Sequence, residues 1–147
     1  LDTEGHLVHI DYGFILGIAP GGSFSIETAP FKLTPEMVDV MGGVDGPLFD
    51  EFAALFAGGF FALQLNMERI VALVEIMAEQ SRYPCFQATD KAVILQRLRT
   101  RLLPGGRAPS SKVDTVAFAL DLITQSYNSL TTLQYERYQN FTNGVAV

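Results

Sequence analysis

The sequence changes character at Thr34, with one short strand-like stretch and a long loop before it and helical patterns after it. Leu7 and His9 alternate with Val8 and Ile10, which predicts a short β-strand entered through a tight turn at 2–5. Residues 14–33 are rich in glycine, proline and serine and have no periodicity, which is typical of a loop. This order predicts a mainly α-helical α+β fold, in which a short N-terminal β-hairpin is followed by about six helices.

Most of these helices are predicted from short residue patterns that are typical of helix N-termini. Thr34 precedes Pro35, Asp90 precedes an apolar pattern, and Ser111 with Asp114 resembles a capping box with Asp in place of Glu. Asn66 is a further candidate cap, whereas Pro84 is expected to break the chain. The predicted helices cover residues 35–41, 48–65, 67–80, 91–102, 112–128 and 131–143.

Spacing of apolar residues predicts which helix faces are buried. The long helix at 48–65 has small residues at 53–54 and 57–59, which would let another element approach closely. The predicted inward faces of two other helices are Met67, Ile70, Val71, Val74, Met77 and Ala78, and Val113, Val116, Ala117, Leu120, Ile123 and Tyr127.

Composition excludes several classes of protein. The formal net charge of −6 argues against a general nucleic-acid binder. The single cysteine, Cys85, cannot form an internal disulfide and suits a reducing, cytoplasmic compartment. The longest uncharged apolar run, Phe52 to Asn66, is shorter than the roughly 20 residues of a transmembrane helix, so we expect a buried core helix and no transmembrane segment.

The strand ends on Asp11-Tyr12-Gly13, an order that suits a metal site of the Asp-Phe-Gly type with Tyr12 in place of Phe. A carboxylate at a strand end is a hard oxygen ligand of the kind that Mg²⁺ prefers. The alternative is a plain hairpin, in which Asp11 caps the following turn.

Several longer blocks of sequence are more specific than this three-residue motif. They are His9 to Leu16, Ala29 to Thr34, Val38 to Gly43, Val74 to Met77, Ser81 to Phe86, Thr131-Thr132 and Thr142 to Gly144. Together they resemble the catalytic core of the phosphatidylinositol 3-/4-kinase family, and within it the type III phosphatidylinositol 4-kinases, the beta form in particular. The resemblance spans nearly the whole chain and fits loosely at about 87–128.

The resemblance implies the C-terminal lobe of a protein-kinase-like lipid kinase, with residues 1–147 forming part of its catalytic domain. It assigns residues 1–13 to the hairpin with the metal-binding Asp11, 14–34 to the activation loop and 35–147 to a helical lobe. Asp11 would bind Mg²⁺, and Ile10 would lie beneath the adenine of ATP. The activation loop would meet the lipid headgroup through Gly13, Phe14, Ser23, Ser25 and Lys32.

The reaction implied is transfer of the ATP γ-phosphate to the 4-hydroxyl of phosphatidylinositol in a membrane. In the family, an Asp-Arg-His-x-x-Asn catalytic loop lies upstream of the segment that Leu1 to His6 resembles, and the phosphate-binding lysine lies further upstream. We therefore expect the 147 residues alone to be inactive. The alternatives are a phosphoinositide 3-kinase, or a non-catalytic helical interaction module or pseudokinase remnant.

Charge in the predicted activation loop bears on the substrate. Residues 14–31 contain no Lys or Arg and a single charge, Glu27, which favours an inositol ring without phosphate. Lys32 would then touch the ring hydroxyls or the phosphodiester, or merely pair with a nearby acid.

Two further features have a membrane interpretation and a plainer one. The basic residues between 91 and 112 either form a solvated helix face or meet anionic headgroups. Tyr135, Tyr138 and Phe141 form one side of the last predicted helix, which is either core or membrane-facing. The resemblance implies a peripheral enzyme on cytosol-facing membranes such as the Golgi, with regulatory partners unknown.

Overall fold

The computed structural model describes residues 3–4, 6, 8, 15–18, 29–103, 111–127 and 129. Within these ranges the chain is mainly helical and contains no strand. The predicted hairpin at 1–13 falls almost entirely outside the described residues, and the predicted helix at 131–143 lies wholly outside them. The described helices are α1 (Pro35–Val40), α2 (Pro47–Leu65), α3 (Met67–Ala78), α4 (Pro84–Ala88), α5 (Lys91–Leu102) and α6 (Lys112–Tyr127).

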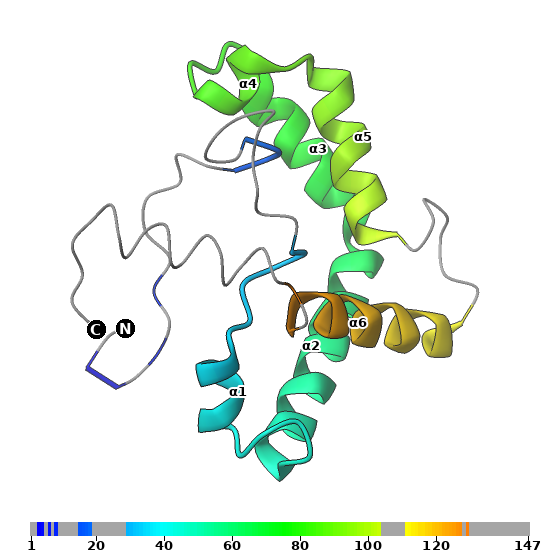
Figure 1. Cartoon of the computed structure of the whole chain (residues 1–147). Helices are drawn as coiled ribbons and strands as arrows, with labels where there is room; N and C mark the ends of the chain where they lie inside the picture. Colours follow the sequence, from blue (N-terminus) through cyan, green and yellow to red (C-terminus); the bar gives the residue numbers. More distant parts are fainter. Residues whose placement is uncertain are drawn as a thin grey trace, which may run out of the picture.

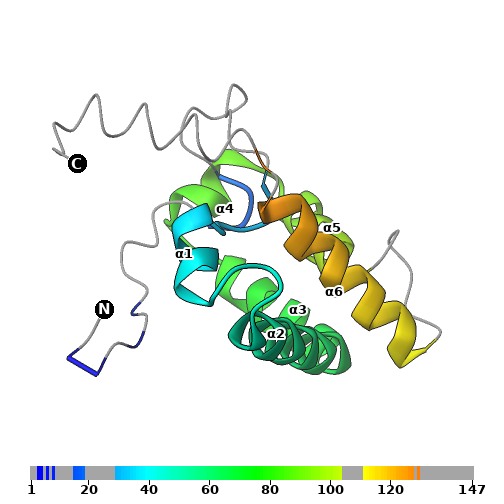
Figure 2. The ribbon, with the colours of Figure 1, turned by 60° about the horizontal axis from the view of Figure 1, so that its bottom comes forward.

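Helices α2 and α3 follow one another along the molecule, with α6 packed against α2 and α5 against α3. In Figure 1, α2 rises through the middle of the molecule, α3 continues upward, and α5 returns beside α3 after the short α4. Helix α6 crosses α2 and packs on it, and the view in Figure 2 places the two helices side by side. Helix α1 lies near the lower end of α2 in Figure 1.

Local capping explains where these helices begin. The Thr34 hydroxyl accepts a hydrogen bond from Met37 N–H at 3.4 Å, and Asp90 Oδ1 accepts one from Ala92 N–H at 2.7 Å. Both caps confirm the prediction from sequence, as does Pro35 in the first turn of α1.

The capping box before α6 is reciprocal, as predicted. Asp114 N–H donates to Ser111 Oγ at 3.2 Å, and Ser111 N–H donates to Asp114 Oδ2 at 3.0 Å. Both N–H groups at the start of the helix thus have a side-chain acceptor. Asp114 therefore fills the role that Glu usually has in a capping box.

Helix α1 ends at its glycines in a Schellman motif. Gly43 N–H donates to Val38 O and Gly42 N–H to Asp39 O, both at 3.0 Å. Gly42 has a φ of 87°, the left-handed conformation that this motif requires after a helix.

One boundary prediction was wrong, and a second is confirmed in position only, since Asn66 is the N-cap residue of α3. Pro84 does not simply break the chain: it begins the one-turn helix α4, which is possible because proline needs no N–H partner at a first helical position. Asn66 does not cap α3 with its side chain; its Nδ2 donates to Ala62 O at 2.9 Å and so closes the end of α2. Cys85, in α4, is buried as a packed thiol.

The core lies where α1 and the segment before it meet α2 and α6. Leu33, Val38 and Ile123 are its buried centre. Phenylalanines of α2 and Phe31 surround them, with the Phe31 and Phe56 rings stacked at 4.9 Å between centroids. The end of the predicted activation segment, residues 14–34, is thus part of the core, through Phe31 and Leu33.

The buried face of α6 differs from the predicted one. The face that packs inward holds Thr115, Ala119, Ile123 and Ser126, whereas Val113 is 74% exposed. The two buried hydroxyls are hydrogen-bonded, with Thr115 Oγ1 donating to Gln64 Oε1 at 2.7 Å and Ser126 Oγ to Leu122 O at 2.8 Å. A search for apolar residues alone missed this face because these polar groups are satisfied inside.

Helix α2 is less buried than predicted. Ala57 is its one fully buried residue, and Leu55 and Leu65 are 69% and 71% exposed. A side chain at Gly58 or Gly59 would meet nothing within 4 Å, so these glycines do not serve close packing. Helix α3 likewise buries Val71 but leaves Met77 56% exposed, against the prediction for Met77.

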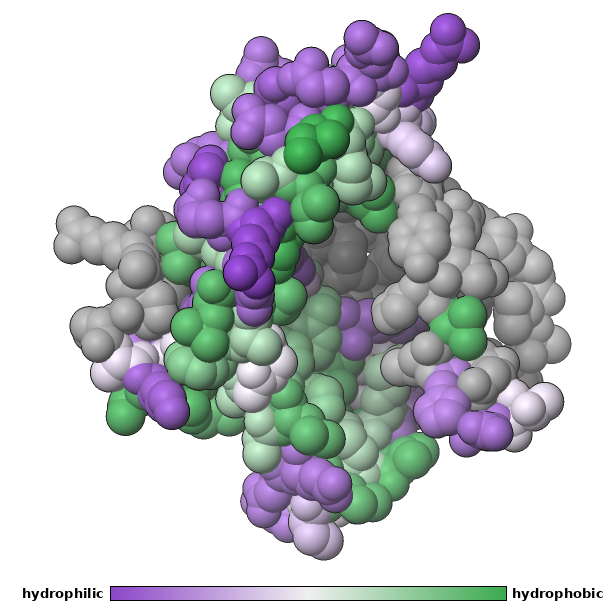
Figure 3. Space-filling model, turned by 180° about the vertical axis from the view of Figure 1, so that it is seen from behind, coloured by the Kyte–Doolittle hydropathy of each residue, from purple (hydrophilic) through white to green (hydrophobic). Residues whose placement is uncertain are grey.

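Apolar side chains therefore reach the surface of this fold. Figure 3 shows green apolar groups between purple polar ones on the face seen from behind. Among the described helices, α2 alone is long and apolar enough to cross a membrane, which is weak evidence of a span because length and composition are its only basis.

Candidate functional site

Most predicted site residues lie outside the described part of the chain. These are Ile10, Asp11, Gly13, Phe14, Ser23, Ser25, Tyr135, Tyr138 and Phe141. Their roles stay predictions. The structure does describe Lys32 and the two ends of the predicted activation segment, 15–18 and 29–34.

The first end is a tight turn. Ile18 N–H donates to Ile15 O at 3.2 Å, and the two central residues, Leu16 and Gly17, have φ values of 53° and 96°. Positive φ at both positions is the pattern of a type I′ turn. Gly17 suits it for a second reason, because a Cβ there would lie 2.9 Å from Nη1 of Arg97.

The second end is fastened to two helices. Arg101 of α5 donates from Nη2 to the carbonyl oxygen of Pro30. Phe31 N–H donates to Ser126 Oγ of α6 at 3.3 Å. Ser126 is 1% exposed, so its hydroxyl is a fixed acceptor inside the fold.

An open cavity of about 1080 Å³ lies between these two ends and the helices that hold them. The segment contributes residues 15–17 and Pro30, α5 contributes most of its length from Ala92 to Arg101, and α6 contributes Phe118 and Leu122. Its wall is mainly apolar, with the guanidinium groups of Arg97 and Arg101 as its cations. One cavity thus borders both ends of the segment predicted to meet the substrate.

Lys32 lies next to the start of α1. The pKa of Glu36 is lowered by a hydrogen bond from its own backbone N–H, by the Thr34 hydroxyl and, last, by the charge of Lys32. The charge of Lys32 is the smallest of these effects, and both interpretations of this lysine stay predictions.

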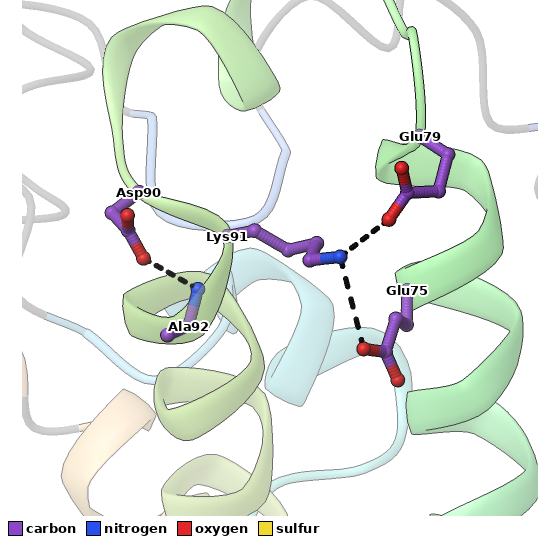
Figure 4. A network of polar contacts seen from close by, with 5 residues as sticks. All are labelled: Glu75, Glu79, Asp90, Lys91 and Ala92. Carbon is purple, nitrogen blue, oxygen red and sulfur yellow. Dashed lines mark hydrogen bonds and ion pairs between the residues drawn. The ribbon is translucent and has the colours of Figure 1, made fainter.

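The basic residues of α5 are divided between two sides of the helix. Lys91 Nζ lies 2.5 Å from Glu79 Oε1 and 3.8 Å from Glu75 Oε1, and Arg99 Nη2 lies 3.4 Å from Glu68 Oε2. Figure 4 shows Lys91 reaching between the two glutamates of α3, beside the Asp90 cap. These two bases pair with α3, and Arg97 and Arg101 face the predicted activation segment.

The contact between Lys91 and Glu79 also shifts the pKa values of both groups. The pKa of Glu79 is lowered because Lys91 donates a hydrogen bond to it and adds an attractive charge. The pKa of Lys91 is raised by the same hydrogen bond, and the charges of Glu79 and Glu75 add to the effect. Lys112, beyond α5, lies over the Phe61 ring at 5.5 Å from its centroid.

No group of three or more metal-ligating side chains occurs among the residues that the structure describes. The predicted Mg²⁺ ligand, Asp11, is not one of them. Its carboxylate has the donor chemistry that suits Mg²⁺.

Sequence reasoning missed Arg97, Arg101 and Ser126 as partners of the predicted segment. A signal for the arginines was present, because residues four apart share a helix face. Their partners were not predictable from spacing, since Arg101 and Pro30 are separated by 71 positions and Phe31 and Ser126 by 95.

Similarity to known proteins identifies the family of this chain. The family model of phosphatidylinositol 3- and 4-kinase matches residues 1–87. Proteins named phosphatidylinositol 4-kinase beta from Danio rerio, Homo sapiens and Bos taurus are each 37% identical over 145 residues, or 99% of this chain. The chain spans 16% of the length of the Danio rerio protein and 17% of the other two. Since the family model covers more than half of its residues, the chain belongs to the phosphatidylinositol 3- and 4-kinase family.

Proposed function

We propose that this chain is the C-terminal lobe of a lipid kinase that transfers the γ-phosphate of ATP to the 4-hydroxyl of phosphatidylinositol. The observation that carries the proposal is the 37% identity to phosphatidylinositol 4-kinase beta over 145 residues, which leaves almost no part of the chain unmatched. The mainly helical structure of the described residues agrees with a kinase C-terminal lobe.

In this proposal Asp11 holds Mg²⁺ at the edge of the cleft, and Ile10 lies against the adenine. Bound Mg²⁺ neutralises charge on the phosphates, which is the main requirement of phosphoryl transfer. Gly13, Phe14, Ser23 and Ser25 belong to the segment that receives the headgroup. Lys32 touches the ring hydroxyls or the phosphodiester of the lipid, or merely pairs with a nearby acid.

Charge supports an inositol ring without phosphate as the substrate. The segment 14–31 contains no Lys or Arg. Lys32 is not the single cation near it, because Arg97 and Arg101 approach its ends from α5. Arg101 already donates to the Pro30 carbonyl, and so it serves the segment itself rather than a second lipid phosphate.

The substrate is tested with the full-length protein and vesicles that hold phosphatidylinositol or one of its monophosphates at matched surface density. We expect unphosphorylated phosphatidylinositol to be preferred and its 4-phosphate to be the product. Preference for a monophosphate would contradict the charge argument, and a 3-phosphate product would favour a phosphoinositide 3-kinase instead.

The role of Asp11 is tested with Asp11→Asn, which should lower kcat by at least about a thousandfold because a metal carboxylate contributes several kcal/mol of barrier reduction. Asp39→Asn, an exposed aspartate of α1, makes the same chemical change elsewhere and should keep full activity. Near-normal turnover of the Asp11 variant would favour a non-catalytic interaction module or a different metal ligand.

In this proposal the protein acts at the cytosolic face of a membrane. Similarity to the beta kinases points to the Golgi membrane. The protein would bind there peripherally, with Tyr135, Tyr138 and Phe141 of the last predicted helix as membrane contacts. Fractionation of cells expressing the tagged full-length protein, with a Golgi marker, tests the location.

A further inference from the structure

The two arginines on the free side of α5 are placed to hold the predicted activation segment at both ends. Arg97 and Arg101 are four residues apart, so they project from the same face of the helix one turn apart. Arg97 lies beside the segment at Gly17, where an added Cβ would come within 2.9 Å of its Nη1, and Arg101 hydrogen-bonds to the segment at Pro30. Arg99, between them, points the other way and pairs with Glu68 of α3.

The contact at Pro30 is chemically suited to fastening a backbone. The Pro30 carbonyl is held by a guanidinium, whose fixed fork of donors loses little freedom when it binds. The next residue, Phe31, donates its N–H to Ser126, and its ring stacks on Phe56. The carbonyl and the N–H of the single peptide group between Pro30 and Phe31 are thus held from α5 and from α6.

At Gly17 the side chain of Arg97 lies close to the turn. A Cβ at this position would come within 2.9 Å of Arg97 Nη1 and 3.5 Å of its Cδ. The guanidinium therefore lies directly against the backbone of the Leu16–Gly17 turn. The fold brings both ends of one segment to a single helix face.

Lys32 is the one cation within the segment, because residues 14–31 lack Lys and Arg. The donors at its ends come from elsewhere in the fold. Helix α5 is a firm base for them, since Ile94, Leu95 and Leu102 are buried and Lys91 and Arg99 pair with α3.

We propose that Arg101, assisted by Arg97, is a positioning residue that fixes the ends of the activation segment on α5 and so determines how that segment receives the inositol headgroup. The link to the headgroup rests on the proposed function, and the anchoring itself does not. Neither arginine touches the reacting atoms in this proposal.

The experiment compares Arg101→Gln and Arg97→Gln with Arg99→Gln in the full-length protein. All three remove one charge from the same helix, but Arg99 contacts α3 and not the segment. Hydrogen–deuterium exchange reports on the peptides that cover residues 15–18 and 29–34. We expect faster exchange in the 29–34 peptide for Arg101→Gln and in the 15–18 peptide for Arg97→Gln, with neither changed for Arg99→Gln.

Kinetics test the consequence for the substrate. We expect Arg101→Gln to raise KM for phosphatidylinositol in vesicles about three- to tenfold, the effect of losing one exposed charge-assisted hydrogen bond, with KM for ATP unchanged. Arg101→Lys keeps the charge and one donor, so it should recover part of the loss in both exchange and KM.

Several results would overturn the proposal. Unchanged exchange at 29–34 in Arg101→Gln, or an equal effect of Arg99→Gln, would refute the anchoring. Faster exchange with unchanged KM for the lipid would refute the link to the headgroup. If Arg101→Gln fails to fold, Arg101→Lys and Arg97→Gln decide by the same readouts. If the unmutated protein phosphorylates no inositol lipid, the proposed function fails and exchange still decides the anchoring.

Discussion

At the scale of single residues, Gly46 and Gly59 differ in the space that an added side chain would have. A Cβ at Gly46 would lie 2.5 Å from Met41 O and 2.9 Å from the carbonyl group of Gly42, all of them backbone atoms that cannot move aside cheaply. A Cβ at Gly59, in the middle of α2, would meet nothing within 4 Å. The first glycine is required by close approach, and the second is a helix residue with excess freedom.

We therefore predict that Gly46→Ala lowers the free energy of unfolding by about 1–3 kcal/mol, as overpacking does. Gly59→Ala should raise it by about 0.5–1 kcal/mol, because alanine favours a helix over glycine. Denaturant unfolding of the two variants measures both effects. A Gly46→Ala variant as stable as the unmutated protein would mean that the turn after α1 adapts more easily than its contacts indicate.

Gln64 is the residue that joins three helices. Its Nε2 donates to Leu102 O at the end of α5 at 2.8 Å, and its Oε1 accepts from the buried Thr115 hydroxyl of α6 at 2.7 Å. We predict that Gln64→Leu destabilises the fold by about 1–3 kcal/mol, because Thr115 is 1% exposed and would lose its partner in the neighbouring helix. The exposed Gln96→Leu is the matched control, and calorimetric melting of both variants is the measurement.

At the scale of helices, the sequence predicted local features well. The caps at Thr34, Asp90 and Ser111 and the end at Gly42 depend on residues within one turn, so their spacing is enough to predict them. The face of α6 was mispredicted because Thr115 and Ser126 are buried through partners on other elements. The sequence of α6 shows the two hydroxyls, but it does not show which distant groups will form hydrogen bonds with them.

The contact between α3 and α5 should depend on pH at the acid side. The pKa of Glu79 is lowered in the fold, so its stabilising effect is present above the ordinary pKa of about 4.5 and is lost as the pH falls through the lowered value. The pKa of Lys91 is raised, so its effect is present below about 10.5 and is lost as the pH rises through the raised value. Between these limits both charges stabilise the pair.

The prediction concerns Glu79→Gln, which removes the acid-side effect. Its difference in unfolding free energy from the unmutated protein should shrink as the pH is lowered from neutrality to about 3. Glu51→Gln, an exposed change on α2, should show no such trend. A difference for Glu79→Gln that stays constant over this range would mean that the pair does not stabilise the fold.

At the scale of the whole molecule, family and helical architecture were predictable, and the surroundings of the predicted activation segment were not. The blocks from His9 to Gly43 identify the family because their order is specific. The approach of Arg97 and Arg101 to the segment depends on how α5 packs across α2 and α3. Such packing is set by the complete fold, which no single stretch of sequence contains.

A membrane contact of the full-length protein is the last prediction. The aromatic side of the predicted helix at 131–143 motivates it, although that helix lies outside the described residues. Replacing both Tyr138 and Phe141 by Ser should weaken co-sedimentation with vesicles of phosphatidylinositol in neutral carrier lipid. Leu55→Ser, at an exposed position of α2, is the comparison. Unchanged binding by a variant of unchanged stability would identify the aromatic side as ordinary packing.

The separation in sequence between contacting residues has a consequence for the order of assembly. The ion pairs between α3 and α5 join positions 12 and 31 apart, whereas the bonds at Pro30 and Phe31 join positions 71 and 95 apart. Contacts between near neighbours close small loops and form early, and those between distant residues form late because loop closure costs more entropy. We expect the α3–α5 hairpin to fold first and the predicted activation segment to dock last. The segment to which the proposed function assigns the headgroup would then join a lobe that is already folded.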